Sequence, residues 1–542
     1  MKRILHLAQG IALAGLLAAA APAAYAASGN WNVNAAGNWS GTANWTPAAV
    51  PGTAAGDVVG LTFNITAART VTIDTTSRTV GTLNIGDPTT GFFVYTLAAS
   101  GGATLTFNNS GSPANLMQAA TTAADVISAP LVLADDLSVN NTSSGGLTLS
   151  GVISGVGRSI TKNGGGLFVL GNGANTNTGK TILYAGTTRI TGTTSLGPVP
   201  AAYTADQLTL DGGLLMNNNS DVILAANQGL TLGGSGGGFQ AGWSRPITVN
   251  SIITGPGGLT FVPDATPGLI SLNAADTYTG PTVVGNNAAN SWSWLLVNGS
   301  LDAASTVTVN ANGLLGGVGA ISGPVTVNTN GSVGPGGVGV AGTLTVNNSA
   351  SISEALLNVD LANVTTEGAG VNDLLQVNGN LTLRGTITVN PSLLNGTLAN
   401  GTYRLINYTG TLDATDATLV CSNPQFGATF DLSTLGQVNM IITNGTPAGL
   451  TWSGAVNPFW DTSTANWLKT GNPVPFTQGD AVTFDDSGKY SFIGELYPIF
   501  LLGPLSSVDT LFPASVSVTT SNSFVMTSVG TAGRLGGGMA LY

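Results

Sequence analysis

The sequence predicts an all-β protein in which short strands stack into a β-solenoid. Three observations lead to this prediction: a strand–turn–strand unit that recurs 101–102 residues later, a high glycine content, and two tryptophan triplets that frame most of the chain. Glycine supplies 77 of 542 residues, about twice its usual share, and recurs between short apolar runs, as turn residues do. Helical periodicity is nearly absent after residue 26.

The repeated unit is clearest in Lys162–Gly197, which reads as a glycine turn, an apolar strand, an Asn/Thr-rich turn and further strands. A degenerate copy lies in Gly257–Val284. The matched positions are Leu170 with Leu272, and Thr178–Thr181 with Thr279–Thr282. Such a unit cannot bury its apolar face alone, so neighbouring units must stack. With about 22 residues per coil we expect about 23 coils and a rod of about 110 Å.

Each tryptophan triplet begins a module that we name an entrance module. The first triplet is Trp31, Trp39 and Trp45, and the second is Trp452, Trp460 and Trp467. Each is followed by a Gly-Asp pair and then a Thr-Phe pair, at Gly56-Asp57 and Thr62-Phe63 and at Gly479-Asp480 and Thr483-Phe484. Because an open solenoid end exposes unpaired strand edges, we expect these indoles to pack as a cap. The alternative is a platform on which carbohydrate stacks.

The chain divides into five predicted segments. They are a signal peptide (1–26), a Trp-led entrance with the first β coils (27–149), a segment with two β-strand repeats at 150–197 and 251–310 (150–310), glycine-rich and further β coils (311–447), and a second Trp-led module (448–542). The final Gly536–Tyr542 resembles the start of another strand, so we expect the second module to be truncated.

Residues 1–26 have the features of a secretory signal peptide. Lys2 and Arg3 precede an uncharged apolar run at 11–20, and Ala24–Ala26 fits a small-x-small cleavage site. No later segment is long enough for a membrane span, since the best candidate, 496–505, is interrupted by proline and glycine. We therefore expect an exported chain without a membrane span, at the cell surface or outside the cell, with a periplasmic location as the alternative.

Histidine, cysteine and charge limit the possible chemistry. The only histidine, His6, lies in the signal peptide, which argues against histidine-based catalysis and most zinc sites. The only cysteine, Cys421, follows a strand-like run and is expected to be a buried thiol. Removing the signal peptide leaves 12 basic and 25 acidic residues, a net charge of −13. An anionic surface argues against nucleic acid as a partner.

The Lys162–Arg189 segment resembles the autotransporter-associated β-strand repeat, also called the passenger-associated transport repeat. The resemblance lies in a Lys-x-Gly-x-Gly strand start and an Asn-x-Tyr-Thr-Gly-x-Thr turn, with Asn177 at the tyrosine position. Asp276–Thr282 is close to the same turn. The resemblance implies a secreted or surface-displayed right-handed parallel β-helix and no catalytic residues. We also expect separate export or anchoring machinery as a partner.

Three motifs suggest chemistry but have structural explanations. Gly179-Lys180-Thr181 looks like the end of a phosphate-binding loop, but Ala174 replaces its first glycine and no helix is expected to follow, so we expect a turn. Glycine-rich runs near 316 and 336 lack the aspartate of calcium-binding repeats. Asp135-Asp136 and Asp485-Asp486 would face opposite sides of a strand, so neither forms an acid–base couple by itself.

We therefore predict an exported, non-catalytic, adhesin-like β-helix that displays its turns to extracellular polysaccharide or surface proteins. No catalytic, cofactor-binding or metal-binding residues are expected. The alternative is a carbohydrate-binding or polysaccharide-cleaving β-helix. Trp243, Trp292 and Trp294 lie outside the triplets and are the candidate ligand-contacting aromatics.

Overall fold

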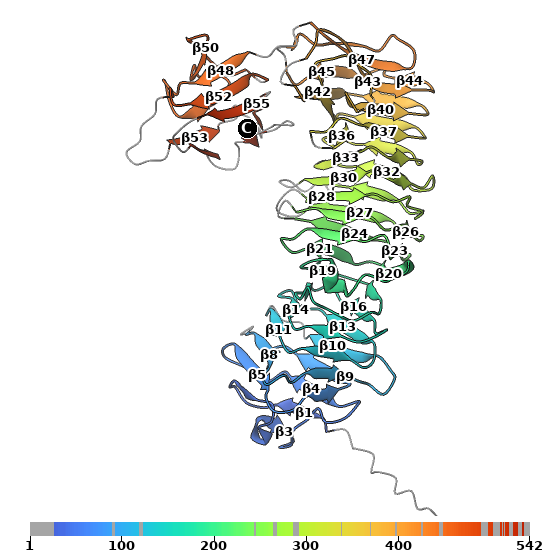
Figure 1. The fold of residues 1–542 in the computed structure, drawn as a ribbon, viewed down its shortest axis with the longest axis vertical. Helices are drawn as coiled ribbons and strands as arrows, with labels where there is room; N and C mark the ends of the chain where they lie inside the picture. The colour runs from blue at the N-terminus through green and yellow to red at the C-terminus, as the bar shows by residue number, and fades with distance from the viewer. Residues whose placement is uncertain are drawn as a thin grey trace, which may run out of the picture.

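The protein is a three-sided parallel β-helix followed by a second, smaller β module (Figure 1). The computed structural model describes residues 27–88, 93–118, 123–242, 245–263, 268–285, 292–337, 339–368, 370–395, 398–423, 426–443, 448–477 and 479–488, and beyond these 497–501, 510–511, 513, 515–519, 524–528 and 534–535. The predicted signal peptide, Trp243 and Gly536–Tyr542 lie outside the described residues.

The second face of the helix is one sixteen-stranded sheet, sheet 2, which runs along the whole β-helix. Its strands in order are β2 (Gly37–Asn38), β5 (Arg69–Ile73), β8 (Tyr95–Ala99), β11 (Asp125–Ile127), β14 (Leu147–Leu149), β17 (Phe168–Leu170), β19 (Thr187–Ile190), β21 (Leu214–Asn217), β24 (Gly237–Ala241), β27 (Leu259–Pro263), β29 (Thr282–Val284), β32 (Val307–Val309), β35 (Val325–Val327), β38 (Ala350–Ser353), β41 (Leu381–Arg384) and β44 (Leu412–Asp413).

Two sheets share the first face, and the later one begins where the earlier one ends. Sheet 1 contains β3 (Trp45–Thr46), β1 (Gly29–Trp31), β4 (Val58–Leu61), β7 (Thr82–Ile85), β10 (Ala114–Gln118), β13 (Leu137–Asn141), β16 (Ile160–Asn163), β18 (Thr181–Leu183), β20 (Thr204–Leu210), β23 (Gln228–Leu232) and β26 (Ile253–Thr254). Sheet 5 contains β31 (Ser300–Leu301), β34 (Ala320–Ile321), β37 (Thr343–Val346), β40 (Leu374–Val377), β43 (Gly401–Tyr408), β47 (Gln437–Ile442) and β46 (Thr429–Asp431).

The third face is also divided between two sheets. Sheet 3 contains β6 (Arg78–Val80), β9 (Leu105–Phe107), β12 (Leu131–Leu133) and β15 (Ile153–Ser154). Sheet 4 contains β22 (Val222–Leu224), β25 (Ile247–Val249), β28 (Gly268–Leu272), β30 (Ser293–Val297), β33 (Gly313–Gly317), β36 (Ser332–Pro335), β39 (Leu356–Leu361), β42 (Thr386–Leu393) and β45 (Thr418–Cys421). Two 3₁₀ turns, η1 (Thr42–Asn44) and η2 (Thr193–Leu196), lie in the connections.

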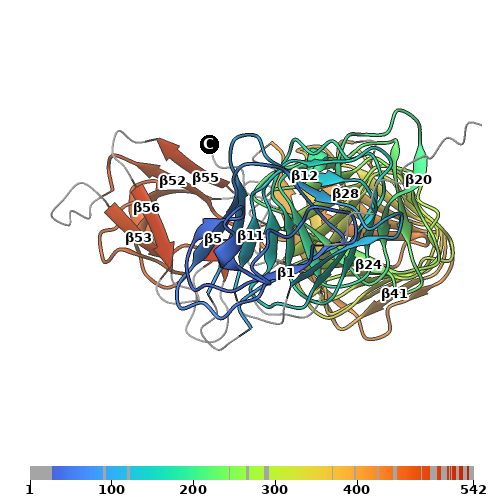
Figure 2. The same ribbon diagram turned by 90° about the horizontal axis from the view of Figure 1, so that it is seen from below.

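Alternating apolar and polar residues place the core inside the coils. In most strands the apolar residues are buried and the intervening polar ones are partly exposed, as in β9 and β14. Identical registers then stack inward side chains from coil to coil, for example Phe239 on Phe261, whose ring centroids are 6.2 Å apart. Seen from below, the coils lie over one another around one core (Figure 2). The predicted all-β fold class, a parallel β-helix, is confirmed.

The predicted coil length and coil number were wrong. Val309 pairs with Val327, 18 residues later, whereas Ile352 pairs with Leu383, 31 residues later. Coils are therefore unequal, because turns between faces carry insertions while the strands stay short. Sixteen strands spaced about 4.8 Å apart make a stack about 70 Å long, shorter than the expected rod.

Antiparallel strands cover both ends of the β-helix. At the start, β3 pairs antiparallel with β1 at the edge of sheet 1, and Trp31 lies opposite Trp45. At the far end, β47 pairs antiparallel with β43, and β46 then pairs antiparallel with β47. Such pairing satisfies backbone groups that an open end would leave exposed. The sequence predicted the first cap from its tryptophans, but it gave no sign of the second.

The module after residue 448 repeats the first coils of the β-helix. It contains β48 (Gly449–Trp452), β50 (Trp467–Lys469), β51 (Asn472–Val474), β52 (Ala481–Asp485) and β55 (Ser515–Thr519) in one sheet; β49 (Phe459–Trp460), β53 (Tyr497–Leu501) and β56 (Phe524–Ser528) in a second; and β54 (Thr510–Leu511) with β57 (Arg534–Leu535) in a third. Strand β48 pairs antiparallel with β50, which contains Trp467, and parallel with β52 of the next coil. Strand β1 pairs in the same way with β3 and β4 in the first coils. The module has its own apolar cluster and lies beside the upper end of the β-helix (Figures 1 and 2).

The strand pairing of the two entrance modules does not agree with the alignment of their sequences. Trp31 lies two residues after Gly29, which pairs with Val59, so the strand position opposite Trp31 belongs to Leu61. The corresponding position opposite Trp452 belongs to Phe484. Leu61 and Phe484 are fully buried, whereas Phe63 is exposed. The match of Phe63 with Phe484 was therefore wrong by two residues.

Candidate functional site

The third face of the β-helix is irregular between sheets 3 and 4. Two segments, 171–180 and 191–203, occupy this face after β15 and before β22 without forming strands. Asn175 joins them: its Oδ1 accepts a hydrogen bond from the Ile153 amide at 2.9 Å, and its Nδ2 donates to the Ser195 carbonyl at 2.8 Å. Thr193 then accepts from the Ile223 amide at 2.9 Å. Side chains thus replace the missing ladder.

A cleft of about 480 Å³ opens beside this irregular stretch, at the corner between the third face and sheet 1. One wall is apolar and consists of Pro198, Val199 and Pro200. The other includes Ser159 and Lys180. A concave site with an apolar wall and a few polar groups is the general form of a small-ligand site.

A β-bulge places a carboxylate against Lys180, which is one of the residues that line the cleft. Between Thr204 and Leu208 the register of β20 against β23 shifts, so that extra residues in β20 oppose fewer in its neighbour. Asp206 lies within the bulge, and its Oδ2 lies 2.6 Å from Lys180 Nζ. Gln207, also in the bulge, is buried and donates to the Gly179 carbonyl at 2.8 Å. Bulges re-aim side chains in this way next to binding sites.

The Gly179-Lys180-Thr181 motif is a turn, as predicted. Strand β18 begins at Thr181, so no helix N-terminus is available for a phosphate. A Cβ atom at Gly179 would lie 2.1 Å from the Arg158 carbonyl carbon and oxygen. Glycine is therefore required for close packing of two coils, and the motif places Lys180 in the cleft wall.

The candidate ligand-contacting tryptophans do not reach this cleft. Trp294 lies in β30 of sheet 4, where its strand neighbours are Leu269 and Leu314, and its side chain is half-buried. Trp292 is also half-buried, just before the same strand. Trp243 lies outside the described residues. A role for these residues in ligand contact stays a prediction.

Both tryptophan triplets are buried, as the cap interpretation predicted. Trp31 and Trp45 make an edge-to-face contact at 5.2 Å, and Trp452 and Trp467 make one at 4.9 Å. All six indoles are at most 3% exposed. A stacking platform needs an exposed ring face, so the carbohydrate-platform alternative for the triplets was wrong.

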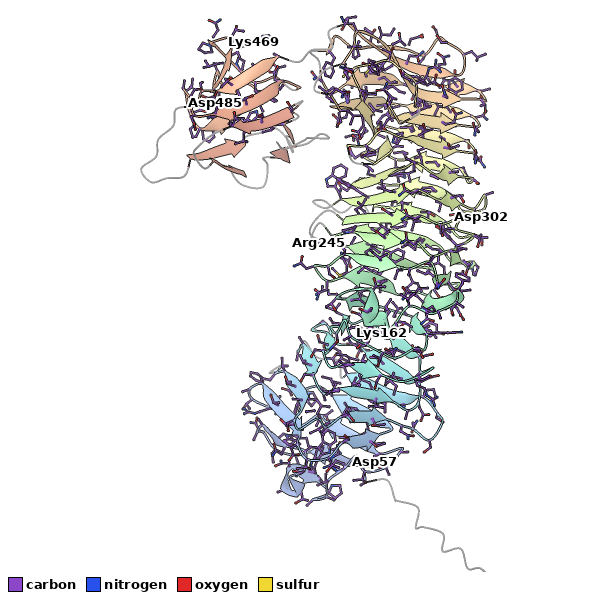
Figure 3. All side chains as sticks on the ribbon, viewed as in Figure 1. Asp57, Lys162, Arg245, Asp302, Lys469 and Asp485 are labelled. Atoms are coloured by element: carbon purple, nitrogen blue, oxygen red, sulfur yellow. The ribbon has the colours of Figure 1, made fainter. Side chains whose placement is uncertain are left out.

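A buried lysine is part of the repeat motif. Lys162 lies on the inward face of sheet 1 between Val139 and Leu183, in the middle of the β-helix (Figure 3). Its Nζ donates to the carbonyls of Asn163, Gly164 and Ala185 at 2.8, 2.7 and 3.3 Å. Burial lowers the pKa of Lys162 to about 8, so the ammonium stays charged at neutral pH. The motif lysine therefore joins coils and offers no free nucleophile.

Sequence reasoning missed a pair of buried carboxyl groups at the corner between sheets 4 and 5. Asp373 accepts hydrogen bonds from the Gly342 amide at 2.7 Å and the Asp360 amide at 2.8 Å. Burial and the nearby Asp360 raise the pKa of Asp373 to about 8. Burial also raises the pKa of Asp360. Because these side chains hold backbone amides inside the protein, they serve the fold. No spacing rule predicts such a pair, since it depends on how the coil turns.

Other candidate chemistry is limited in the residues that the structure describes. Cys421 is half-buried against the core, and burial raises the pKa of its thiol to about 11, so it is protonated at neutral pH. In these residues, His, Cys, Asp and Glu do not gather in groups of three that could hold a metal ion. Within the same ranges, no helix has the length and apolar character needed to cross a membrane.

One curated protein resembles part of the chain. Over 262 aligned residues, which cover 44% of this chain, the sequence is 31% identical to a protein of Brucella suis biovar 1 (strain 1330) named "Adhesin BmaC autotransporter". The match spans 7% of that relative's length. No protein-family model matches the sequence.

Proposed function

We propose that this protein is an exported, non-catalytic passenger-type β-helix that mediates adhesion at the cell surface or in the extracellular matrix. The observation that carries the proposal is sheet 2, whose sixteen parallel strands form one continuous stack. Every coil of such a stack is hydrogen-bonded to the next, so the rod is stiff and presents its turns at fixed intervals. Many weak contacts along one rigid rod add through multivalency.

Similarity to a protein named as an autotransporter adhesin supports this proposal for the matched part of the chain. The parallel β-helix also fits an autotransporter passenger, and the predicted signal peptide supports export. The likeness to the autotransporter-associated β-strand repeat remains part of the proposal. Extracellular polysaccharide and surface proteins are the proposed partners, with separate machinery for export or anchoring.

The low charge of the chain favours adhesion over catalysis. Only 7% of residues are charged, and the buried carboxyl groups Asp360 and Asp373 accept backbone hydrogen bonds. A polysaccharide-cleaving enzyme needs two carboxyl groups that flank an accessible bond. The surface is therefore better suited to many neutral contacts than to acid–base chemistry.

The proposal is tested with beads coated with the purified chain. The beads are applied to immobilised polysaccharides, matrix proteins and cultured cells, and the same incubations are assayed for released reducing sugar. Adhesion above that of uncoated beads, without sugar release, is the expected result. Absence of adhesion on every surface would contradict the proposal, and sugar release that carboxylate substitutions abolish would replace it with the enzymatic alternative.

A further inference from the structure

We propose that the cleft between Lys180 and the Pro198–Pro200 wall binds a neutral hexopyranose chain. This inference rests on the proposed adhesive function and names the ligand of one site on the rod. Nothing in the sequence singled out the cleft, because its parts come from three successive coils. Ser159 follows β15, Lys180 precedes β18, and Val199 lies in the longer connection before β20.

The two walls match the two chemistries of a sugar ring. A pyranose presents carbon-bound hydrogens on its faces and hydroxyl groups around its edge. In the cleft, Pro198, Val199 and Pro200 form an apolar wall, and Val199 is 42% exposed. The lining also includes Lys180 and Ser159, whose side chains are polar. Apolar contact with directed hydrogen bonds is the usual basis of small-ligand recognition.

Lys180 and Asp206 retain hydrogen-bonding capacity after they pair. Their side chains are 45% and 47% exposed, so solvent reaches both partners of the 2.6 Å ion pair. The ammonium has three donors and the carboxylate has about four acceptor positions. The contact between them uses one donor and one acceptor position. A sugar hydroxyl both donates and accepts, so two neighbouring hydroxyls can bridge Asp206 and Lys180 at once.

Charge favours a neutral polymer over an acidic one. The ion pair neutralises Lys180 within the cleft, and Asp136 lies next to it, with its Oδ1 accepting from the Ser159 amide at 2.9 Å. The whole chain carries a net charge of −11. A uronic acid or sulfated sugar would have to displace Asp206 and enter a negative field.

Backbone irregularity places the cleft where a chain-like ligand can lie. The third face has no strands between β15 and β22, and the cleft opens beside this stretch. The bulge in β20 is a second and independent feature, since it brings Asp206 toward Lys180. A rod that holds a polysaccharide segment here would still present its remaining surface to other contacts.

Cellohexaose, mannohexaose and maltohexaose are the probes, with hexagalacturonate as the charged counterpart. Binding to the full chain is measured by isothermal titration calorimetry and saturation-transfer NMR. Asp206→Asn removes the charged acceptor and Val199→Asp places a charge in the apolar wall. Each should weaken binding of the preferred neutral hexaose about tenfold or more. Asp413→Asn is the matched control, because Asp413 forms a similarly exposed ion pair with Arg384 far along the rod.

Unchanged thermal unfolding of all three variants is expected, because exposed ion pairs contribute little to stability. The inference is overturned if no neutral hexaose binds at millimolar concentration, if binding survives both cleft variants, or if hexagalacturonate binds more tightly. Bead adhesion measured with the parent chain and the same variants separates the two proposals. Bead adhesion by the parent chain without binding of any neutral hexaose removes the cleft proposal but keeps the adhesive function, whereas hexaose binding without bead adhesion does the reverse.

Discussion

Asn175 and Asp276 occupy the same position in two copies of one turn. The Ile153 amide donates to Asn175 Oδ1 at 2.9 Å, and the Ile253 amide donates to Asp276 Oδ1 at 2.8 Å. The second side-chain atom differs: Asn175 Nδ2 donates to the Ser195 carbonyl, whereas Asp276 Oδ2 is buried without a hydrogen-bond partner among the described residues. Burial raises the pKa of Asp276 to about 7. A carboxyl group whose pKa is raised by burial thus takes the place of an amide.

We predict that Asp276→Asn stabilises the β-helix and removes a pH dependence. The folded state holds the Asp276 proton more tightly than the unfolded state, whose pKa is about 3.9. The contribution of Asp276 to the free energy of unfolding is therefore most favourable below about pH 4, and it falls as pH rises toward 7. The loss at higher pH is at most about 4 kcal/mol.

Urea unfolding between pH 4 and 8 checks this prediction. The free energy of unfolding of the Asp276→Asn variant should exceed that of the parent protein, and the difference should grow from pH 4 to pH 8. Asp302→Asn is the control. Asp302 is half-exposed, and its side chain accepts a hydrogen bond from the Ala304 amide that an asparagine side chain would also accept. Equal pH profiles for the parent and Asp276→Asn would contradict the prediction.

The same turn contains a buried amide without partners, and this leads to a second prediction. Asn177 is 1% exposed, and both polar atoms of its side chain lack hydrogen bonds among the described residues. Tyr278, at the matched position, is buried with its hydroxyl 2.6 Å from Thr282 Oγ1. Asn177→Leu should raise the free energy of unfolding by about 1–3 kcal/mol, because it removes an unpaired buried polar group.

Denaturant unfolding of Asn177→Leu and of the smaller Asn177→Val tests this expectation. Asn172→Leu is the matched control in the same turn, since Asn172 donates to the Ser150 carbonyl and accepts from the Ala174 amide. That control should lose stability. If both Asn177 variants are less stable than the parent, the amide makes a favourable contact and the prediction fails.

The turn shows what a single sequence predicts well. Thr176 and Thr277 amides donate to the Ile153 and Ile253 carbonyls, as the 101-residue match implied. Yet β18 lies in sheet 1 and its counterpart β29 lies in sheet 2, so the two copies occupy different faces. Sequence similarity fixes how a turn packs on the preceding coil. The face it occupies depends on the summed lengths of all earlier connections, which local patterns do not determine.

The cleft and the buried carboxyl pair escaped prediction for the same reason. Asp206 reaches Lys180 only because β20 is bulged, and Asp360 meets Asp373 only because the intervening chain turns a corner. Tryptophans were easier to assign, since a large apolar side chain has few alternatives to burial. Polar residues have several possible roles, and only coil-to-coil register selects one of them.

A third prediction concerns a column of left-handed residues at the bend between sheets 2 and 4. Asn312, Asn330 and Glu354 have φ values of 61°, 60° and 47°, and the amide of each of the first two donates to the carbonyl of the next. Asparagine tolerates this region, whereas glutamate has no such preference. Glu354→Gly should therefore raise the free energy of unfolding by about 1 kcal/mol.

Denaturant unfolding measures this gain against Ser351→Gly, which introduces glycine into the nearby strand β38. The control should lose about 0.5–1 kcal/mol, because glycine in a strand costs backbone entropy. A loss in Glu354→Gly as large as in the control would mean that the hydrogen bond from Thr329 Oγ1 to Glu354 Oε2 outweighs the backbone strain.

The final prediction follows from the two separate apolar clusters. Trp467 is fully buried and contacts Trp452, Trp460 and Phe484 in the second module. Trp45 is equally buried in the main core. Because the clusters are distinct, Trp467→Ala should destabilise the second module by about 3–5 kcal/mol and leave the β-helix unchanged. Trp45→Ala should destabilise the β-helix and leave the second module unchanged.

Scanning calorimetry of the two variants distinguishes these outcomes. We expect two thermal transitions in the parent, with only the transition of the substituted cluster shifted in each variant. A fold with one shared core would unfold in one transition, and both substitutions would then lower it together. Such a result would mean that the contact between Asn423 and the Gly479 carbonyl, 3.1 Å apart, belongs to a cooperative interface rather than a simple junction.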